Sequence, residues 1–232
     1  MTNQKEHYEQ LWLGSLKKFE SGKFELDSHI YSKNDNRYGL TLIARPSIKV
    51  RKNVSEMLNK IQLIAPGQYY YPVSDMHVTV LSIISSQAGF TLKNIDLPKY
   101  TELIKSTIAN IGPLNINFQG ITASPSAIMI CGFPELNALN NIRFKLRETF
   151  KQSSLYHTID QRYFLQTAHI TVIRFCRELS NLSAFIQKVQ ELKDTQFGSC
   201  TINELELVGN DWYQRKDKVE RIEKFKLQNS TA

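Results

Sequence analysis

The hydrophobic and polar positions of the chain predict helices and strands along most of its length. Apolar residues recur at three- and four-residue steps from Tyr8 to Phe19, which is the pattern of an amphipathic helix, and Ser21-Gly22 interrupts it. The polar stretch that follows is typical of a loop. We therefore expect an N-terminal amphipathic helix and linker over residues 1–36 and one further domain over residues 37–232.

Short apolar runs bounded by Pro, Gly or polar residues predict strands, and apolar positions about 3.6 residues apart predict helices. The expected strands cover residues 39–44, 76–84, 114–119, 127–131, 169–175, 202–208 and 219–227. The expected helices cover residues 48–63, 98–110, 134–150 and 182–192. Ser47 is a suitable N-cap for the first of these helices. The last two strands are expected to form a hairpin around the polar turn 211–218.

The order of these elements repeats. A strand from Gly39, a helix and a strand holding His77 form one unit, and a strand from Ala127, a helix and a strand holding His169 form a second. The first strand begins 38 residues before His77 and 42 residues before His169 in the respective units. The order of elements, rather than residue identity, thus indicates internal duplication. If the units pack about a pseudo-two-fold axis, both histidines face one cleft.

The two histidines share a motif. One strand reads His77-Val-Thr79-Val and the other reads His169-Ile-Thr171-Val, so both have the form H-x-T-V. Residues two apart on a strand point to the same face, so each strand presents an imidazole and a hydroxyl side by side. A chain of this length with 5 histidines and 14 threonines would contain about 0.3 H-x-T matches by chance.

Two imidazoles and two hydroxyls in one cleft suit phosphoryl transfer. A neutral imidazole can take a proton from an attacking water or hydroxyl, and a protonated imidazole can give one to the leaving oxygen. The threonine hydroxyls can donate hydrogen bonds to the non-bridging phosphate oxygens. This chemistry requires neither a metal nor a cofactor, and the sequence has no third ligand spaced to complete a zinc site with the two histidines.

Composition and charge narrow the class of protein. The chain is 41% hydrophobic and 22% charged, a globular mixture that excludes a wholly disordered protein. No apolar run is long enough to cross a membrane, and the polar first residues lack a signal-peptide core. The three cysteines are widely spaced, so we expect a cytoplasmic protein with buried or unreactive thiols. The net charge of +7 hints at an anionic partner, and the stretch 143–177 carries seven basic residues against two acidic ones.

The paired motifs resemble the 2H phosphoesterase superfamily, which includes 2′-5′ RNA ligase-like proteins, 2′,3′-cyclic nucleotide phosphodiesterases and relatives that cleave 2′-5′ oligoadenylate. The second motif continues as His169-Ile-Thr171-Val-Ile-Arg174, which is similar to the H-x-T-[LV]-x-R form common there. Ser82 stands at the corresponding place of the first motif. Residues 37–77 are also similar to a bacterial subgroup that sometimes carries the label mutarotase.

This resemblance implies an α+β fold that is bilobal and duplicated, with two antiparallel sheets and flanking helices around a central cleft. It implies metal-independent hydrolysis or formation of a 2′-phosphoester bond at a ribose. His77 and His169 would be the acid and base, and Thr79 and Thr171 would bind phosphate. The implied partner is a nucleotide or RNA with a 2′,3′-cyclic or 2′-5′ phosphate. We expect a monomer without a membrane partner.

Four further residues are candidates for substrate contacts. Arg174 could bind phosphate, but strict alternation places it opposite His169, so it needs a bulge or a strand end to reach the site. Tyr71 and Trp212 are candidate platforms for a base, and Ser82 offers a hydroxyl. The remaining histidines, His7, His29 and His157, are expected at the surface or in loops.

Two alternatives remain open. A non-catalytic RNA-binding or sensing module with the same fold would explain the basic stretch 143–177 and would bind RNA in a salt-dependent way without turnover. A sugar mutarotase would use two histidines as acid and base on a hemiacetal, but it leaves the threonine pair without a task.

Overall fold

Two antiparallel sheets form the centre of the computed structural model, which describes residues 4–228. The four-stranded sheet has the order β3-β1-β8-β9 and consists of β3 (Val78–Ala88), β1 (Arg37–Ala44), β8 (Glu204–Asp211) and β9 (Glu220–Lys226). The five-stranded sheet has the order β2-β6-β5-β4-β7 and consists of β2 (Tyr69–Tyr70), β6 (Ile170–Arg174), β5 (Ala127–Pro134), β4 (Leu114–Ser124) and β7 (Gln196–Ile202).

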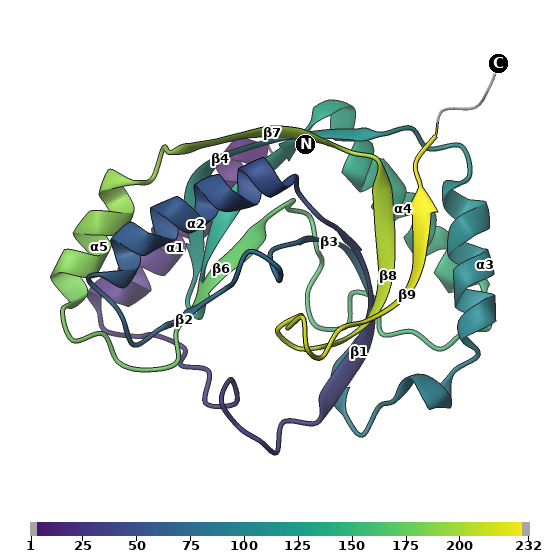
Figure 1. The fold of residues 1–232 in the computed structure, drawn as a ribbon, viewed down its shortest axis with the longest axis horizontal. Helices are drawn as coiled ribbons and strands as arrows, with labels where there is room; N and C mark the ends of the chain where they lie inside the picture. The colour runs from purple at the N-terminus through teal and green to yellow at the C-terminus, as the bar shows by residue number, and fades with distance from the viewer. Residues whose placement is uncertain (1–3, 229–232) are drawn as a thin grey trace.

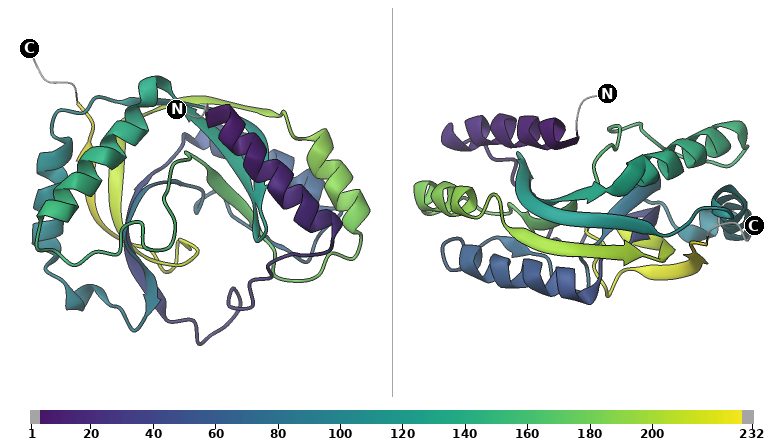
Figure 2. Two further views of the ribbon diagram at one scale, coloured as in Figure 1. Left: turned by 180° about the vertical axis from the view of Figure 1, so that it is seen from behind. Right: turned by 90° about the horizontal axis from the view of Figure 1, so that it is seen from above.

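Five α-helices flank the sheets. They are α1 (Gln4–Glu20), α2 (Ile48–Gln62), α3 (Leu97–Ile108), α4 (Ala138–Gln152) and α5 (Leu182–Glu191). Helices α1, α2 and α5 gather around the five-stranded sheet, and α3 and α4 cover the outer side of the four-stranded sheet (Figures 1 and 2). The expected bilobal α+β fold with two antiparallel sheets and flanking helices is confirmed.

The repeated unit of strand, helix and strand is present as β1-α2-β3 and β5-α4-β6. In each unit the helix packs on the sheet of the other unit, because α2 contacts β7 and α4 contacts β3. The side view in Figure 2 shows helices and strands from both halves of the chain on each side of the molecule. This exchange joins the two halves into one body and holds β3 and β6 in a fixed relation.

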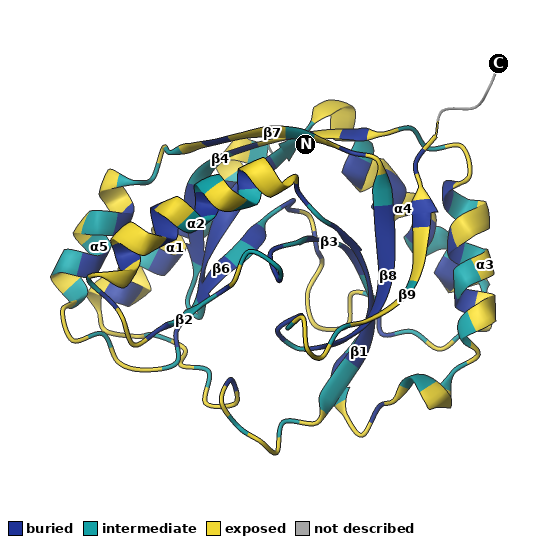
Figure 3. Ribbon diagram, in the orientation of Figure 1, coloured by how far each residue is buried: buried dark blue, intermediate teal, exposed yellow. Residues whose placement is uncertain are grey.

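Helix α1 is built into the body through buried side chains and hydrogen bonds. Tyr8, Trp12 and Phe19 are buried on the face that lies along β4. The Tyr8 hydroxyl donates to the Gly132 carbonyl at 3.1 Å, and the Ser15 hydroxyl donates to the Ala123 carbonyl at 2.9 Å. Figure 3 shows the inner strands buried, strands β7 and β9 mostly exposed and the helices exposed on their outer faces. Within residues 4–228 no helix has both the length and the apolar character needed to span a bilayer.

The structure differs from the predicted elements in four places. Strands β2 and β7 were not predicted. Strand β2 is too short to show a periodicity, and β7 is a mostly exposed edge strand whose residues do not alternate. Ile202 ends β7 rather than starting the C-terminal hairpin, so that hairpin begins at Glu204. The helix predicted from Pro134 begins at Ala138, because Leu136 and Asn137 adopt left-handed backbone angles with φ of 52° and 56°.

Candidate active site

The two H-x-T motifs lie at equivalent places in the two sheets. His77 comes directly before β3, and His169 comes directly before β6. Both histidines line one cavity together with Thr79 and Thr171, so the structure brings these four residues together from two sheets. The cavity is also lined by the four other candidates, which are Tyr71, Ser82, Arg174 and Trp212.

Matching β-bulges bring the fifth residue after each histidine into this cavity. In the pairing of β3 with β1, Val80 is an extra residue that has no partner, and Val172 has the same place in the pairing of β6 with β5. Such a bulge shifts the alternation of side chains by one residue. Ser82 and Arg174 therefore face the cavity. For Arg174 this is the bulge that the strand pattern in the sequence required if its side chain was to reach the site.

The first imidazole has a fixed tautomer. His77 Nδ1 lies 2.7 Å from the Asp75 carbonyl oxygen. A carbonyl can only accept, so Nδ1 carries the proton of the neutral ring and Nε2 is left with a free lone pair. Burial lowers the pKa of His77 to about 4, and the charges of Arg45 and Arg174 act in the same direction. The neutral ring is therefore the dominant form at pH 7.

The second imidazole has a partner that permits either tautomer. His169 Nδ1 lies 2.6 Å from the Thr167 hydroxyl, which can donate or accept. When Thr167 donates, the ring proton sits on Nε2. Burial, together with the charges of Arg143, His77 and Arg174, lowers the pKa of His169 to about 3. Desolvation and positive neighbours thus keep both rings neutral in the absence of an anion.

Arginines and aromatic rings gather at one part of the cavity wall. Strand β2 pairs with β6, which places Tyr71 so that its hydroxyl accepts a hydrogen bond from Arg174 Nε at 3.0 Å. The Trp212 ring lies 4.9 Å from the guanidinium of Arg162, 5.2 Å from that of Arg37 and 5.8 Å from that of Arg174. This part of the cavity wall therefore combines positive charge with aromatic rings.

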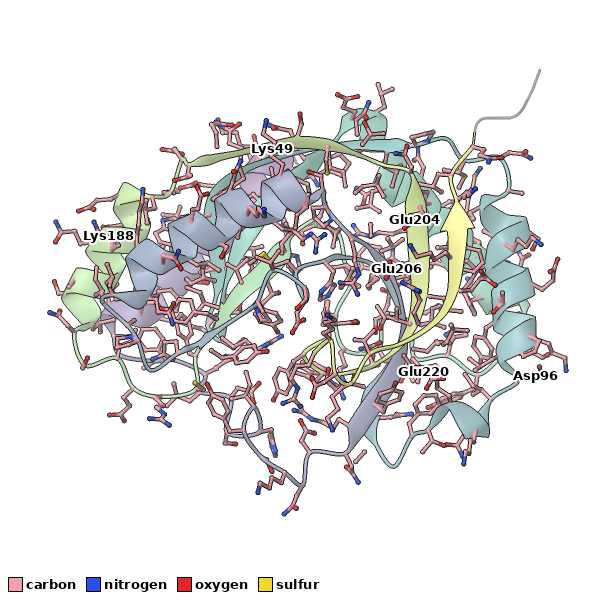
Figure 4. All side chains as sticks on the ribbon, viewed as in Figure 1. Lys49, Asp96, Lys188, Glu204, Glu206 and Glu220 are labelled. Atoms are coloured by element: carbon pink, nitrogen blue, oxygen red, sulfur yellow. The ribbon has the colours of Figure 1, made fainter. Side chains whose placement is uncertain are left out.

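The segment that leads to His77 is anchored to the four-stranded sheet. Arg45 donates to the Ser74 carbonyl at 2.9 Å and pairs with Glu206 at 3.0 Å. Glu206 lies on β8, where Figure 4 labels it. The Lys216 backbone amide donates to the Asp75 carboxylate at 3.2 Å, which joins this segment to the turn after β8. These contacts hold the carbonyl that fixes the His77 tautomer.

Neither protein-family models nor curated proteins match this sequence. Solved structures do match. TT0787 of Thermus thermophilus is 15% identical, with a TM-score of 0.57 over 83% of this chain and 99% of that chain. E. coli LigT complexed with 3′-AMP is 10% identical, with a TM-score of 0.55 over 83% and 99%. A protein of unknown function from Agrobacterium tumefaciens is 13% identical, with a TM-score of 0.51 over 85% and 92%.

The chain has the LigT fold. At these identities the likeness concerns the architecture, and it confirms the fold that the resemblance to 2H phosphoesterases implied. A protein described as a phosphoesterase shares this fold with a TM-score of 0.56. LigT has been crystallised with 3′-AMP, ATP, NADP+ and phosphate.

Within this LigT fold, Arg143 is a buried residue near the site that the sequence reading missed. It is 0% exposed on α4, and it donates to the carbonyls of Val80 at 2.9 Å, Thr79 at 2.7 Å and Thr167 at 2.8 Å. One guanidinium thus joins the backbones of both motif segments. The sequence feature that could have revealed it is the position of Arg143 in the apolar stripe of the helix, four residues after Leu139. Burial lowers the pKa of Arg143 to about 10.

The basic stretch 143–177 contributes to the cavity only in part. Arg162 and Arg174 line the cavity, whereas Arg143 binds carbonyls and Arg147 pairs with Asp160 at 2.6 Å. Arg162, which was not singled out from the sequence, lies in an irregular segment that has no periodicity. The positive charge at the site is therefore local and comes from a few side chains.

The other histidines lie outside the site. His7 lies on α1, and His29 and His157 lie in loops. Among residues 4–228, no group of three or more His, Cys, Asp or Glu side chains is arranged to hold a metal ion.

Proposed function

We propose that this protein is a metal-independent phosphodiesterase that acts on 2′,3′-cyclic phosphate or 2′-5′ phosphodiester bonds of nucleotides or RNA. The observation that carries the proposal is the convergence of both H-x-T motifs on one cavity. The LigT fold supports the class of enzyme, and the nucleotides bound to LigT support a nucleotide ligand.

The hydrogen bonds of the imidazoles suggest which step each residue performs. In hydrolysis, water attacks phosphorus and His77 Nε2, which has the free lone pair, takes the proton of the water. The bond from phosphorus to the ribose oxygen breaks, and that oxygen takes a proton from Nε2 of His169, which acts as the imidazolium and becomes neutral. The bound phosphate brings a negative charge that offsets burial and the arginine charges, so it raises the pKa values of both rings toward neutral pH.

Thr79, Thr171 and Arg174 would bind the phosphate. All three line the cavity beside the histidines, and a hydroxyl or guanidinium can donate to the oxygens on which charge builds in the transition state. Tyr71 would orient Arg174 through its hydroxyl. Because this set has no task in opening an aldose ring, we do not carry the mutarotase alternative further.

A non-catalytic nucleotide-binding or RNA-binding module is the second candidate. The low pKa values of both histidines favour it, because the protein without a ligand holds no imidazolium at pH 7. Such a module would bind nucleotides with a salt-dependent affinity and would release no product.

Turnover in the presence of EDTA separates the two candidates. We expect purified protein to hydrolyse a 2′,3′-cyclic nucleotide, or an RNA with that end, at a rate that EDTA does not change. His29→Gln, a change at an exposed histidine, is the matched control and should keep full activity. Binding of the nucleotide without any product, across the four bases and 2′-5′ oligoadenylate, would establish the binding module instead.

A further inference from the structure

Two amide side chains in the cavity have acceptor atoms without partners. Asn210 and Gln214 are 4% and 5% exposed, and both line the cavity on either side of Trp212 in the sequence. Among residues 4–228, neither Asn210 Oδ1 nor Gln214 Oε1 has a hydrogen-bond partner, although both atoms are buried. Buried acceptors are nearly always paired in folded proteins, so two unpaired ones in one cavity point to a ligand that donates to them.

The orientation of the Asn210 amide is fixed. Its Nδ2 atom donates to the Asp211 carbonyl oxygen at 2.8 Å, so an exchange of the nitrogen and oxygen would place two acceptors against each other. The unpaired atom is therefore the oxygen. Gln214 adopts a left-handed backbone conformation with φ of 59°, which a residue with a Cβ rarely adopts without a compensating interaction. Both features belong to the turn that carries the side chains into the cavity.

The turn itself is held rigidly from the side away from the cavity. The Tyr213 hydroxyl donates to Asp27 at 2.8 Å and accepts from Arg37 at 3.0 Å. Arg215 donates to the Asp211 carboxylate at 2.6 Å. These bonds position Asn210, Trp212 and Gln214 before any ligand binds, which is the condition for a selective site.

We propose that Asn210, Trp212 and Gln214 form a subsite for a nucleobase that carries an exocyclic amino group. This inference rests on the proposed function, since it places the base of the substrate beside the reacting phosphate. The two oxygens require donors, and the amino groups of cytosine, adenine and guanine supply N–H bonds. Uracil and hypoxanthine present a carbonyl oxygen at the place of the amino group in cytosine and adenine. Trp212 adds an aromatic face for the ring of the base.

The test compares substrates that differ at one functional group. We expect the wild-type protein to use cytidine 2′,3′-cyclic phosphate with a kcat/KM at least about tenfold above that for the uridine compound, because a site built to accept from N–H groups rejects an analogue that lacks them. The adenosine and inosine compounds form a second matched pair. Equal kcat/KM values within both pairs would overturn the inference while leaving the proposed function intact.

Substitutions in the turn test the same base preference by changing the protein instead of the substrate. Gln214→Met and Asn210→Leu remove the acceptors with little change of shape, and we expect the preference for cytidine over uridine to fall toward one. Gln190→Met, at an exposed position on α5, is the control and should keep the wild-type preference. Unfolding midpoints distinguish a ligand site from a structural one. Gln214→Met removes an unpaired buried acceptor and should leave the midpoint unchanged or raise it, whereas Asn210→Leu also removes the hydrogen bond to the Asp211 carbonyl. A marked fall of the midpoint in Gln214→Met with an unchanged preference would contradict the inference.

Measurements of nucleotide affinity test the inference even if the protein has no turnover. Calorimetry with 3′-CMP and 3′-UMP measures the same discrimination without any reaction. Absence of turnover with tighter binding of 3′-CMP would remove the proposed function and keep the base subsite. Turnover with no discrimination in either assay would do the reverse.

Discussion

The two imidazoles of the cavity have different Nδ1 partners, and this difference sets their tautomers. His77 donates to a carbonyl that can only accept, whereas His169 meets a hydroxyl that can adapt. Both pKa values lie well below the ordinary value of about 6.5, at about 4 and about 3, because burial disfavours the charged ring. Under the proposed function, the anionic substrate is therefore part of the acid–base system.

This dependence on the substrate predicts the pH profiles. Profiles of kcat/KM report the protein without substrate, and profiles of kcat report the complex. We expect both to be bell-shaped, with the optimum of kcat/KM at a lower pH than that of kcat, because the bound phosphate raises the pKa values of His77 and His169. Steady-state rates between about pH 2.5 and pH 9 measure both optima, because the pKa values of the protein without substrate are about 4 and about 3. Coinciding optima would show that the bound phosphate does not raise these pKa values.

The threonine hydroxyls supply the second prediction for single residues. Thr79→Val and Thr171→Val keep the shape of each side chain and remove the donor, so we expect kcat to fall by about 10²-fold in each variant. The Ser variants, which restore a hydroxyl, should recover most of the rate. Kinetics with unfolding midpoints as a control measure the effect, and a full rate in both Val variants would remove the hydroxyls from the mechanism.

Helix α4 acts on the site through its buried arginine. Arg143 satisfies carbonyls of both motif segments, and its own charge is buried among them. Arg143→Met would leave these carbonyls without that partner, and each buried unpaired group costs about 1–3 kcal/mol. We expect a fall of several kcal/mol in the free energy of unfolding, measured with urea.

The Arg143→Lys variant distinguishes the effect of Arg143 on the rate from its effect on the stability of the fold. A lysine keeps the charge but cannot bridge the carbonyls in a fixed fork. We therefore expect kcat to fall in a protein that still folds. We also expect a changed pH profile, because the lysine ammonium would not occupy the place of the guanidinium charge that lowers the pKa of His169. Lys145→Met on the exposed side of the same helix is the control. A wild-type pH profile in Arg143→Lys would limit the arginine to a structural role.

Helix α1 belongs to the core rather than to the site. Trp12 is 3% exposed, whereas its neighbour Leu13 is 49% exposed. We expect Trp12→Ala to lower the free energy of unfolding by about 3–5 kcal/mol and Leu13→Ala to change it little. Rates measured well below the unfolding transition should stay at the wild-type level in both variants. Equal effects on stability would contradict the packing of α1 on β4.

At the scale of the whole molecule, much of the fold and part of the site could be predicted from local pattern. The H-x-T strands, the repeated order of elements and the helices with an apolar stripe all carry a short-range signal. Arg174 could be placed only conditionally, because a bulge is set by the pairing of two strands rather than by the sequence of one. Strand β7 was not predicted, because an exposed edge strand needs no alternation of apolar and polar residues.

The residues that escaped prediction act through long-range contacts. Arg143 reaches carbonyls 63 and 64 residues away in the chain, and Arg162 enters the site from an irregular segment. Asn210 and Gln214 have no motif, and their unpaired oxygens become visible only when the burial of each atom is known. Such features depend on packing between the halves, which periodicity does not encode.

The central claim is that His77 and His169 together catalyse phosphodiester cleavage. The most direct measurement is the rate at which the His77→Ala, His169→Ala double variant converts a 2′,3′-cyclic nucleotide to the monoester in EDTA, followed by ³¹P NMR beside the wild type. We predict conversion by the wild type and none above the uncatalysed rate by the folded double variant. Full conversion by the double variant would contradict the account.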